Sequence, residues 1–177
     1  MLVWLLLTMT ISAAALQDTF TLRCDIQAWY DEVAQTVLQS RTPNDVDIDH
    51  SVFETDDVSF VDVDGHRHDW AEVRARNLLT LQEPPADQMR LILRDVKTTP
   101  GGAVAVVRSL TVRTSIDGEG RYGRAGASHA IATALTYRDT LVQSGTSWKL
   151  KVREQLGPPA TLVDKLPNDI ESSRCGS

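Results

Sequence analysis

The residue pattern of this chain changes once, near Pro84-Pro85, and the change limits the folds open to it. Before the prolines, apolar residues recur at helical spacings; after them, long stretches are rich in β-branched residues and alternate between apolar and polar. Helices followed by an uninterrupted run of strands are typical of an α+β domain, in which helices cover one face of a sheet. The length of 177 residues suits one such domain.

The part before the prolines predicts two helices. The first spans residues 20–41 and places five apolar residues on one helical face: Leu22, Ile26, Trp29, Val33 and Val37. Pro43 ends this helix, and the acidic stretch 44–50 is expected to be a connector. The remaining elements are a strand at 57–63, a tight turn at Asp64-Gly65 and a second helix at 70–82 with Asp69 as its N-cap.

The part after the prolines predicts four consecutive antiparallel strands, at residues 90–98, 103–116, 129–143 and 147–156. The glycine-rich loop between the second and third lacks the spacing of a phosphate-binding loop, and no cofactor is expected. The two helices would cover one face of a curved sheet. The sequence therefore predicts an α+β domain with a curved antiparallel sheet wrapped around a long N-terminal helix.

The N-terminal run has the features of a signal peptide. The first charged side chain is Asp18, and the apolar run before it ends in Ala13-Ala14-Ala15, a small-residue site that signal peptidase accepts. The run is shorter than the roughly 20 apolar residues of a membrane-spanning helix. We therefore expect a signal peptide at 1–15, a domain at 18–157 and a C-terminal tail at 158–177. The mature protein would be secreted or periplasmic, with no membrane span.

The two cysteines, Cys24 and Cys175, lie near opposite ends of the predicted mature chain. In an oxidising compartment they could form a disulfide; the alternative, two unrelated thiols, remains open at this point. The net charge of −6, without a cluster of Lys or Arg, argues against a nucleic-acid partner.

Two stretches carry a family resemblance. Residues 53–65, FETDDVSFVDVDG, form an acidic, aromatic strand that ends in a glycine turn, and Thr136–Val142 leads through Gly145 to Trp148-Lys149-Leu150. With the order of elements, they resemble the nuclear transport factor 2-like superfamily (SnoaL-like, cystatin-like α+β), nearest to its bacterial domains of unknown function. The resemblance implies a cone-shaped fold with an apolar pocket and a homodimer formed through the sheet. It also implies that catalytic members use a carboxylate base with a Tyr or protonated acid as oxyanion donor.

Three residues are the candidate catalytic groups. Tyr137 and Asp139 share one face of their strand. If that face points inward, Asp139 is the best available general base, since burial favours a basic carboxylate. If it points outward, Arg138 faces the pocket and could hold an anion. The alternative to both possibilities for this strand is a surface ion pair. Tyr30, beside the core face of the first helix, is the candidate oxyanion donor; the alternative is a boundary aromatic residue with its hydroxyl in water.

Trp29 and Trp148 are expected in the core or the pocket wall, and with Arg138 they are the candidate ligand-binding residues. His66 and His68 could bind a metal with Asp62, Asp64 or His129 as further ligands. The preferred interpretation is a polar loop that leads into the N-cap of the second helix, without a metal.

Two hypotheses follow. In the first, the chain is an exported domain that binds a small apolar molecule, with isomerase- or dehydratase-like acid/base chemistry. In the second, it is a non-catalytic homodimeric or partner-binding module whose pocket is filled by its own side chains. A pocket with room for a ligand and convergent polar groups would favour the first.

Overall fold

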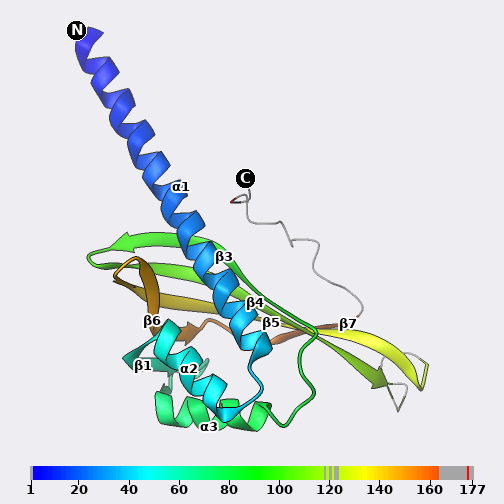
Figure 1. Ribbon diagram of the computed structural model, residues 1–177. Coiled ribbons are helices and arrows are strands. Elements are labelled where there is room, and N and C mark those ends of the chain that lie inside the picture. The colour runs from blue at the N-terminus through cyan, green and yellow to red at the C-terminus, as the bar shows by residue number, and fades with distance from the viewer. Residues whose placement is uncertain (1, 118, 120, 122–123, 164–174, 176–177) are drawn as a thin grey trace.

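The computed structural model describes residues 2–117, 119, 121, 124–163 and 175, with side chains described from residue 19 onward. It confirms an α+β fold with a curved, unclosed sheet. Helix α1 (Leu2–Gln39) crosses one face of this sheet, and α2 (Pro43–Phe53) and α3 (Trp70–Thr80) gather near the C-terminal end of α1 (Figure 1). The first half of α1 extends beyond the sheet (Figure 1).

The sheet has the strand order β2-β1-β6-β5-β4-β3. Its strands are β1 (Glu54–Val61), β2 (Arg67–Asp69), β3 (Gln88–Thr99), β4 (Gly102–Asp117), β5 (Ala127–Ser144) and β6 (Ser147–Gln155). The four predicted strands correspond to β3–β6, which pair antiparallel in sequence order. β1 joins β6 in parallel, so the sheet is mixed. A further strand, β7 (Ala160–Val163), pairs with β5 within the segment predicted as a tail.

The prediction of a connector at 44–50 is wrong, because this acidic stretch forms most of α2. Thr42 is the N-cap of this helix, where its hydroxyl accepts a hydrogen bond from the Asp45 amide and the Asp45 carboxylate accepts one from the Thr42 amide. Pro43 occupies the first turn, where the missing N–H costs nothing. The proline that prevents continuation of α1 therefore also begins α2.

The core lies between α1 and the concave face of the sheet. Ile26, Trp29, Tyr30 and Ala34 of α1 pack against buried residues of the sheet: Leu91, Leu93, Ala103, Ala105, Val107, Leu141 and Leu150. Among the strands, the backbone of α1 comes closest to β3. The C-terminal half of α1 therefore lines the concave side of the sheet, with its backbone nearest to β3.

Gln27 attaches α1 to β3, the outermost strand on one side of the sheet. Its side-chain amide donates to the Leu91 carbonyl and accepts from the Leu93 amide, both at 2.8 Å. Arg23 adds a hydrogen bond of 2.9 Å to the Leu93 carbonyl. Gln27 is buried, and these bonds satisfy its amide.

A disulfide joins Cys24 to Cys175, with the Cα atoms 5.3 Å apart, so the structure has the bridge and not two separate thiols. The bond ties Cys175 to α1. Among the described residues, no helix combines the length and hydropathy needed to cross a membrane.

Candidate functional site

Three side chains form a buried network on the concave face. Asp139 of β5 is fully buried and lies opposite Arg153 of β6 in the strand register. The Arg153 guanidinium donates to both carboxylate oxygens, from Nε at 2.9 Å and from Nη2 at 2.6 Å. The Tyr30 hydroxyl donates to Asp139 Oδ2 at 2.8 Å. The network thereby links α1, β5 and β6.

The charges in this network are well defined. Burial alone would lower the pKa of Arg153, but the Asp139 carboxylate outweighs it and raises this pKa above its usual range, so Arg153 is a cation. Burial, aided by the Asp139 charge, raises the pKa of Tyr30 well above its usual value. Burial also raises the pKa of Tyr137, whose ring lies 4.8 Å from the Arg153 guanidinium carbon. Both tyrosines are therefore neutral hydrogen-bond donors.

A cavity of about 330 Å³ opens beside this network. Arg153 and Tyr137 line it, together with an apolar wall that includes Val33, Val37, Phe60, Met89 and Leu91. Asp139 does not line the cavity, because Arg153 occupies both of its oxygens and stands on the cavity side. The cavity thus has a fixed cation and a neutral phenol beside an apolar wall, with further polar residues in its lining: Glu54, Asp62, His68, Arg76, Asn77 and Gln155.

A second cavity, of about 170 Å³, lies between α1, α2 and α3 and adjoins the first. His50 Nδ1 lies 2.7 Å from Glu54 Oε2, and the His50 ring stacks on Trp70 with centroids 3.9 Å apart. Glu54 lines both cavities. Burial raises its pKa, although the hydrogen bond from His50 acts in the opposite direction.

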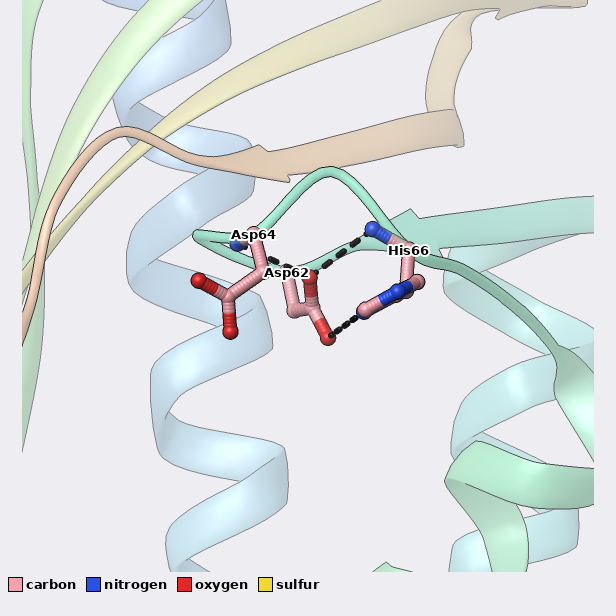
Figure 2. Close-up of side chains that lie close together, drawn as sticks. All are labelled: Asp62, Asp64 and His66. Atoms are coloured by element: carbon pink, nitrogen blue, oxygen red, sulfur yellow. Dashed lines mark hydrogen bonds and ion pairs between the residues drawn. The ribbon is translucent and has the colours of Figure 1, made fainter.

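The histidine-rich turn lies at the rim of the larger cavity. Asp62 Oδ1 accepts the backbone N–H groups of Asp64 at 3.0 Å and His66 at 2.9 Å, and Oδ2 lies 3.6 Å from His66 Nδ1 (Figure 2). Oδ2 also lies 3.1 Å from His68 Nε2. The hydrogen bond from His68 is the main cause that lowers the pKa of Asp62. Gly65 supplies the positive φ of 85° that the turn requires.

Asp62, Asp64 and His66 could each offer one metal-ligand atom, and these atoms lie within 4.8 Å of one another. Both Asp62 oxygens already have partners within the turn (Figure 2). The turn leads into α3, whose N-cap Asp69 accepts the Glu72 amide at 3.0 Å. His129, the other ligand considered, lies on β5 opposite Ser115 of β4. The arrangement matches a polar turn that leads into a helix cap.

The structure brings the three candidate catalytic residues together: Tyr30 and Asp139 share a hydrogen bond, and Tyr137 faces the same side of β5 as Asp139. The candidate ligand-binding residues lie elsewhere. Trp29 is in the core against the Tyr30 ring, 4.9 Å between centroids, and Trp148 packs on the same core. Arg138 points to the opposite face and pairs with Glu154 at 2.9 Å.

Arg153, Glu54 and His50 are site residues that the sequence reasoning missed. Alternation along β6 from the buried Leu150 would place Val152 inward and Arg153 outward. A β-bulge between Leu150 and Val152 reverses this order. The pair His50 and Glu54 has the i, i+4 spacing of one helix face, a signal that is visible only if residues 44–50 are predicted to be helical.

No known family model matches the sequence, and no curated protein is detectably similar to it. Similar solved structures exist. Aln2 from a Streptomyces species has a TM-score of 0.54 at 16% identity and covers 76% of this chain and 89% of its own. LinA has a TM-score of 0.50 at 13% identity, and the match covers 86% of this chain and 94% of LinA. A Nostoc punctiforme protein of unknown function with a cystatin-like fold has a TM-score of 0.45 at 15% identity and covers 72% and 87%.

At identities this low, the similarity is evidence for the fold alone. The chemistry has to be argued from the residues of this chain. The element order, the curved sheet and the two similarities with TM-scores of 0.54 and 0.50 agree with the resemblance seen in the sequence. The chain has the nuclear transport factor 2-like, cystatin-like α+β fold.

Proposed function

We propose that this protein is an exported, SnoaL-like small-molecule-binding protein that holds an apolar ligand by an oxygen atom and carries out isomerase- or dehydratase-like acid/base chemistry. The observation that carries the proposal is that Arg153 and Tyr137 line one cavity together with an apolar wall. The cavity is also lined by polar residues: Glu54, Asp62, His68, Arg76, Asn77 and Gln155. Apolar walls bind a carbon skeleton, and a few fixed polar groups orient it.

Two polar groups of the cavity, Tyr137 and Arg153, suit an oxygen that gains negative charge. The neutral Tyr137 hydroxyl can donate a hydrogen bond, and the Arg153 guanidinium supplies a positive charge. Because Asp139 and Tyr30 hold Arg153 in place, no reorganisation is needed when charge develops on the ligand, which is the basis of oxyanion stabilisation. Tyr30 and Asp139 are then positioning residues, and Asp139 is not free to accept a proton from a ligand.

Export is supported by the apolar N-terminal segment and by the disulfide, since disulfides persist in oxidising compartments. The homodimer is supported by the outer face of the sheet, where Val104, Val106, Val142 and Val152 are only partly buried. An interface there would leave the concave cavity open to ligand. We expect light scattering to give a dimer mass for the wild type and a monomer mass for Val106→Lys; a wild-type monomer would contradict the interface.

The binding proposal can be tested with two bicyclic probes, 2-tetralone and tetralin, which differ in the carbonyl oxygen. We expect tetralone to bind more tightly in ligand-observed NMR titrations. Tyr137→Phe should weaken its binding by about tenfold, the equivalent of one hydrogen bond. The matched control is Arg138→Gln, the next residue of β5 on the opposite face, which should bind like wild type. Equal affinity for both probes, or binding of neither, would contradict the proposal.

A further inference from the structure

Arg76 of α3 is a cation in the lining of the larger cavity, and within the described part of the chain no carboxylate lies at ion-pair distance from it. Its side chain is exposed, and its Nη2 atom lies 3.4 and 3.5 Å from the two ring nitrogens of His68. The other charged side chains of this lining have partners: Glu54 with His50, Asp62 with His68 and Arg153 with Asp139. The charge of Arg76 is therefore available to a ligand.

The acids of the cavity rim face His68 and not Arg76. Asp62 Oδ2 lies 3.1 Å from His68 Nε2, and Glu72 Oε2 lies 3.2 Å from His68 Nδ1. Glu72 is one turn before Arg76 on α3, where it could have formed an ion pair with it. Because the histidine ring takes both carboxylates, the guanidinium of Arg76 keeps its donors free.

The strand register shows how far this cation lies from the oxygen-binding groups. His68 of β2 is opposite Phe60 of β1, and Phe60 is opposite Arg153 of β6. Neighbouring strands are about 4.8 Å apart, so the backbones at His68 and Arg153 are separated by roughly 10 Å. Phe60 lies between them and contributes to the apolar wall. The cavity therefore has one polar end at Arg153 and a second polar end at Arg76.

The two polar ends differ in net charge. Arg153 directs Nε and Nη2 to the Asp139 carboxylate, so this end is close to neutral and suits an oxygen that is uncharged when the ligand binds. A ligand carboxylate at that end would be repelled by the charge of Asp139. Arg76 has no such counter-ion among the described residues, and a guanidinium is always protonated. An anionic group of a ligand would therefore bind at Arg76.

We propose that this site selects amphipathic acids, in which an apolar skeleton has a carbonyl oxygen at one end and a carboxylate at the other. The carbonyl oxygen binds at Tyr137 and Arg153, and the carboxylate binds at Arg76. This inference rests on the proposed function, because the first of these two ends is the oxygen subsite proposed above. Arg76 is a specificity-determining residue: it distinguishes acids from neutral molecules of the same shape.

The position of Arg76 on α3 suits this role. Val73, Arg76 and Asn77 all line the cavity and have the i, i+3, i+4 spacing of one helix face. The aliphatic part of an arginine can cover apolar surface while its charged head stays in water. A carboxylate bound there keeps part of its hydration, so the cost of desolvation is small. The attraction is also screened by salt, as for other exposed charges.

The test uses a matched pair of probes, 6-acetyl-2-naphthoate and its carboxamide, which share the rings and the ketone and differ in charge. In ligand-observed NMR titrations at low salt, we expect the naphthoate to bind the wild type more tightly. Arg76→Gln should weaken naphthoate binding by about tenfold, the lower end for a hydrogen bond to a charged group, because Arg76 is exposed. The same variant should bind the carboxamide like wild type.

The matched control is Arg90→Gln, which removes an exposed arginine from β3. Met89 and Leu91 line the cavity, so alternation places Arg90 on the opposite face of the strand. This variant should bind both probes like wild type. In about 1 M salt, where the Debye length is roughly 3 Å, the preference of the wild type for the naphthoate should shrink. A preference that does not change with salt would contradict Arg76 as its source.

The outcomes separate this inference from the proposed function. If the naphthoate binds no more tightly than the carboxamide, or if Arg76→Gln weakens both probes equally, the acid-binding end is wrong and only this inference fails. Tyr137→Phe should weaken both probes alike, because both have the ketone. If Tyr137→Phe changes the affinity of neither probe nor of 2-tetralone, the proposed function fails and this inference fails with it.

Discussion

The paired strands β5 and β6 contain two Arg–carboxylate pairs in neighbouring register, and they differ in burial. Asp139–Arg153 lies on the concave face, with the Asp139 side chain 0% exposed and the Arg153 side chain 18% exposed. Arg138–Glu154 lies on the outer face, with side chains 50% and 41% exposed. The two pairs therefore allow the stability contribution of a buried ion pair to be compared with that of an exposed one in the same protein. The perturbation is Asp139→Asn, compared with Glu154→Gln.

The expected cost differs severalfold between the two variants. Asp139→Asn keeps the shape of the side chain and an acceptor for Tyr30 but leaves the Arg153 charge without its counter-ion, which typically costs roughly 3–5 kcal/mol of unfolding free energy. The residual exposure of Arg153 places the expectation in the lower half of that range. Glu154→Gln breaks an exposed pair, which is typically worth roughly 0.2–1 kcal/mol.

The assay is thermal and urea unfolding at pH 7, with the disulfide intact. For a chain of this length, 1 kcal/mol corresponds to a change in Tm of roughly 2–4 °C. Asp139→Asn should therefore lower Tm by roughly 6–16 °C and Glu154→Gln by less than about 4 °C. The double variant Asp139→Asn with Arg153→Gln removes the uncompensated charge as well. It should be no less stable than Asp139→Asn alone.

Two results would refute this reasoning. Equal losses of stability in Asp139→Asn and Glu154→Gln would show that burial does not determine how much an ion pair contributes to the unfolding free energy. A double variant that is less stable than Asp139→Asn alone would show that the cost of Asp139→Asn does not come from an unpaired Arg153 charge.

Tyr30→Phe removes one hydrogen bond to the Asp139 carboxylate and should cost roughly 1.5–3 kcal/mol in urea unfolding; a neutral substitution would show that the bond contributes nothing. Reduction of Cys24–Cys175, which closes a loop with a sequence separation of 151, should cost roughly 5 kcal/mol in the chain-entropy model, measured by unfolding with and without reductant; an unchanged midpoint would contradict this. Because burial raises the pKa of Glu54 in the folded state, its favourable contribution is complete below the unfolded pKa near 4.5 and is lost as pH rises through the folded pKa. Glu54→Gln should therefore flatten the dependence of unfolding free energy on pH from about 4 upward, and an unaltered dependence would contradict the shift.

The sequence predicts the parts of this fold that depend on local patterns. The apolar face of α1, the strands β3–β6 and the shared face of Tyr137 and Asp139 all follow from periods of 3.6 and 2. The parallel pairing of β1 with β6 joins segments roughly 90 residues apart, and local periodicity carries no information about such a partner. The convergence of Tyr30 on Asp139, 109 positions later, likewise depends on how α1 lies across the sheet.

The site itself was predictable only in part. Its two strand residues, Tyr137 and Asp139, could be placed by alternation, but the direction of their face could not. Arg153, which decides what Asp139 can do, is turned inward by a bulge that interrupts alternation at one residue. As a result, the candidate general base in the sequence becomes a positioning residue in the structure.

The hydrogen bonds between Gln27 and β3 also affect how readily copies of this chain aggregate. A strand at the margin of a sheet offers N–H and C=O groups to which a second chain can add its own strand, and repetition of that step gives fibres. At Leu91 and Leu93 these groups are already engaged by a buried amide, with α1 lying over them. The opposite margin, β2, is three residues long and too short to template a stable addition. We therefore expect both ends of the sheet to resist polymerisation as long as α1 stays in place, and loosening of that helix to be the event that exposes the chain to aggregation.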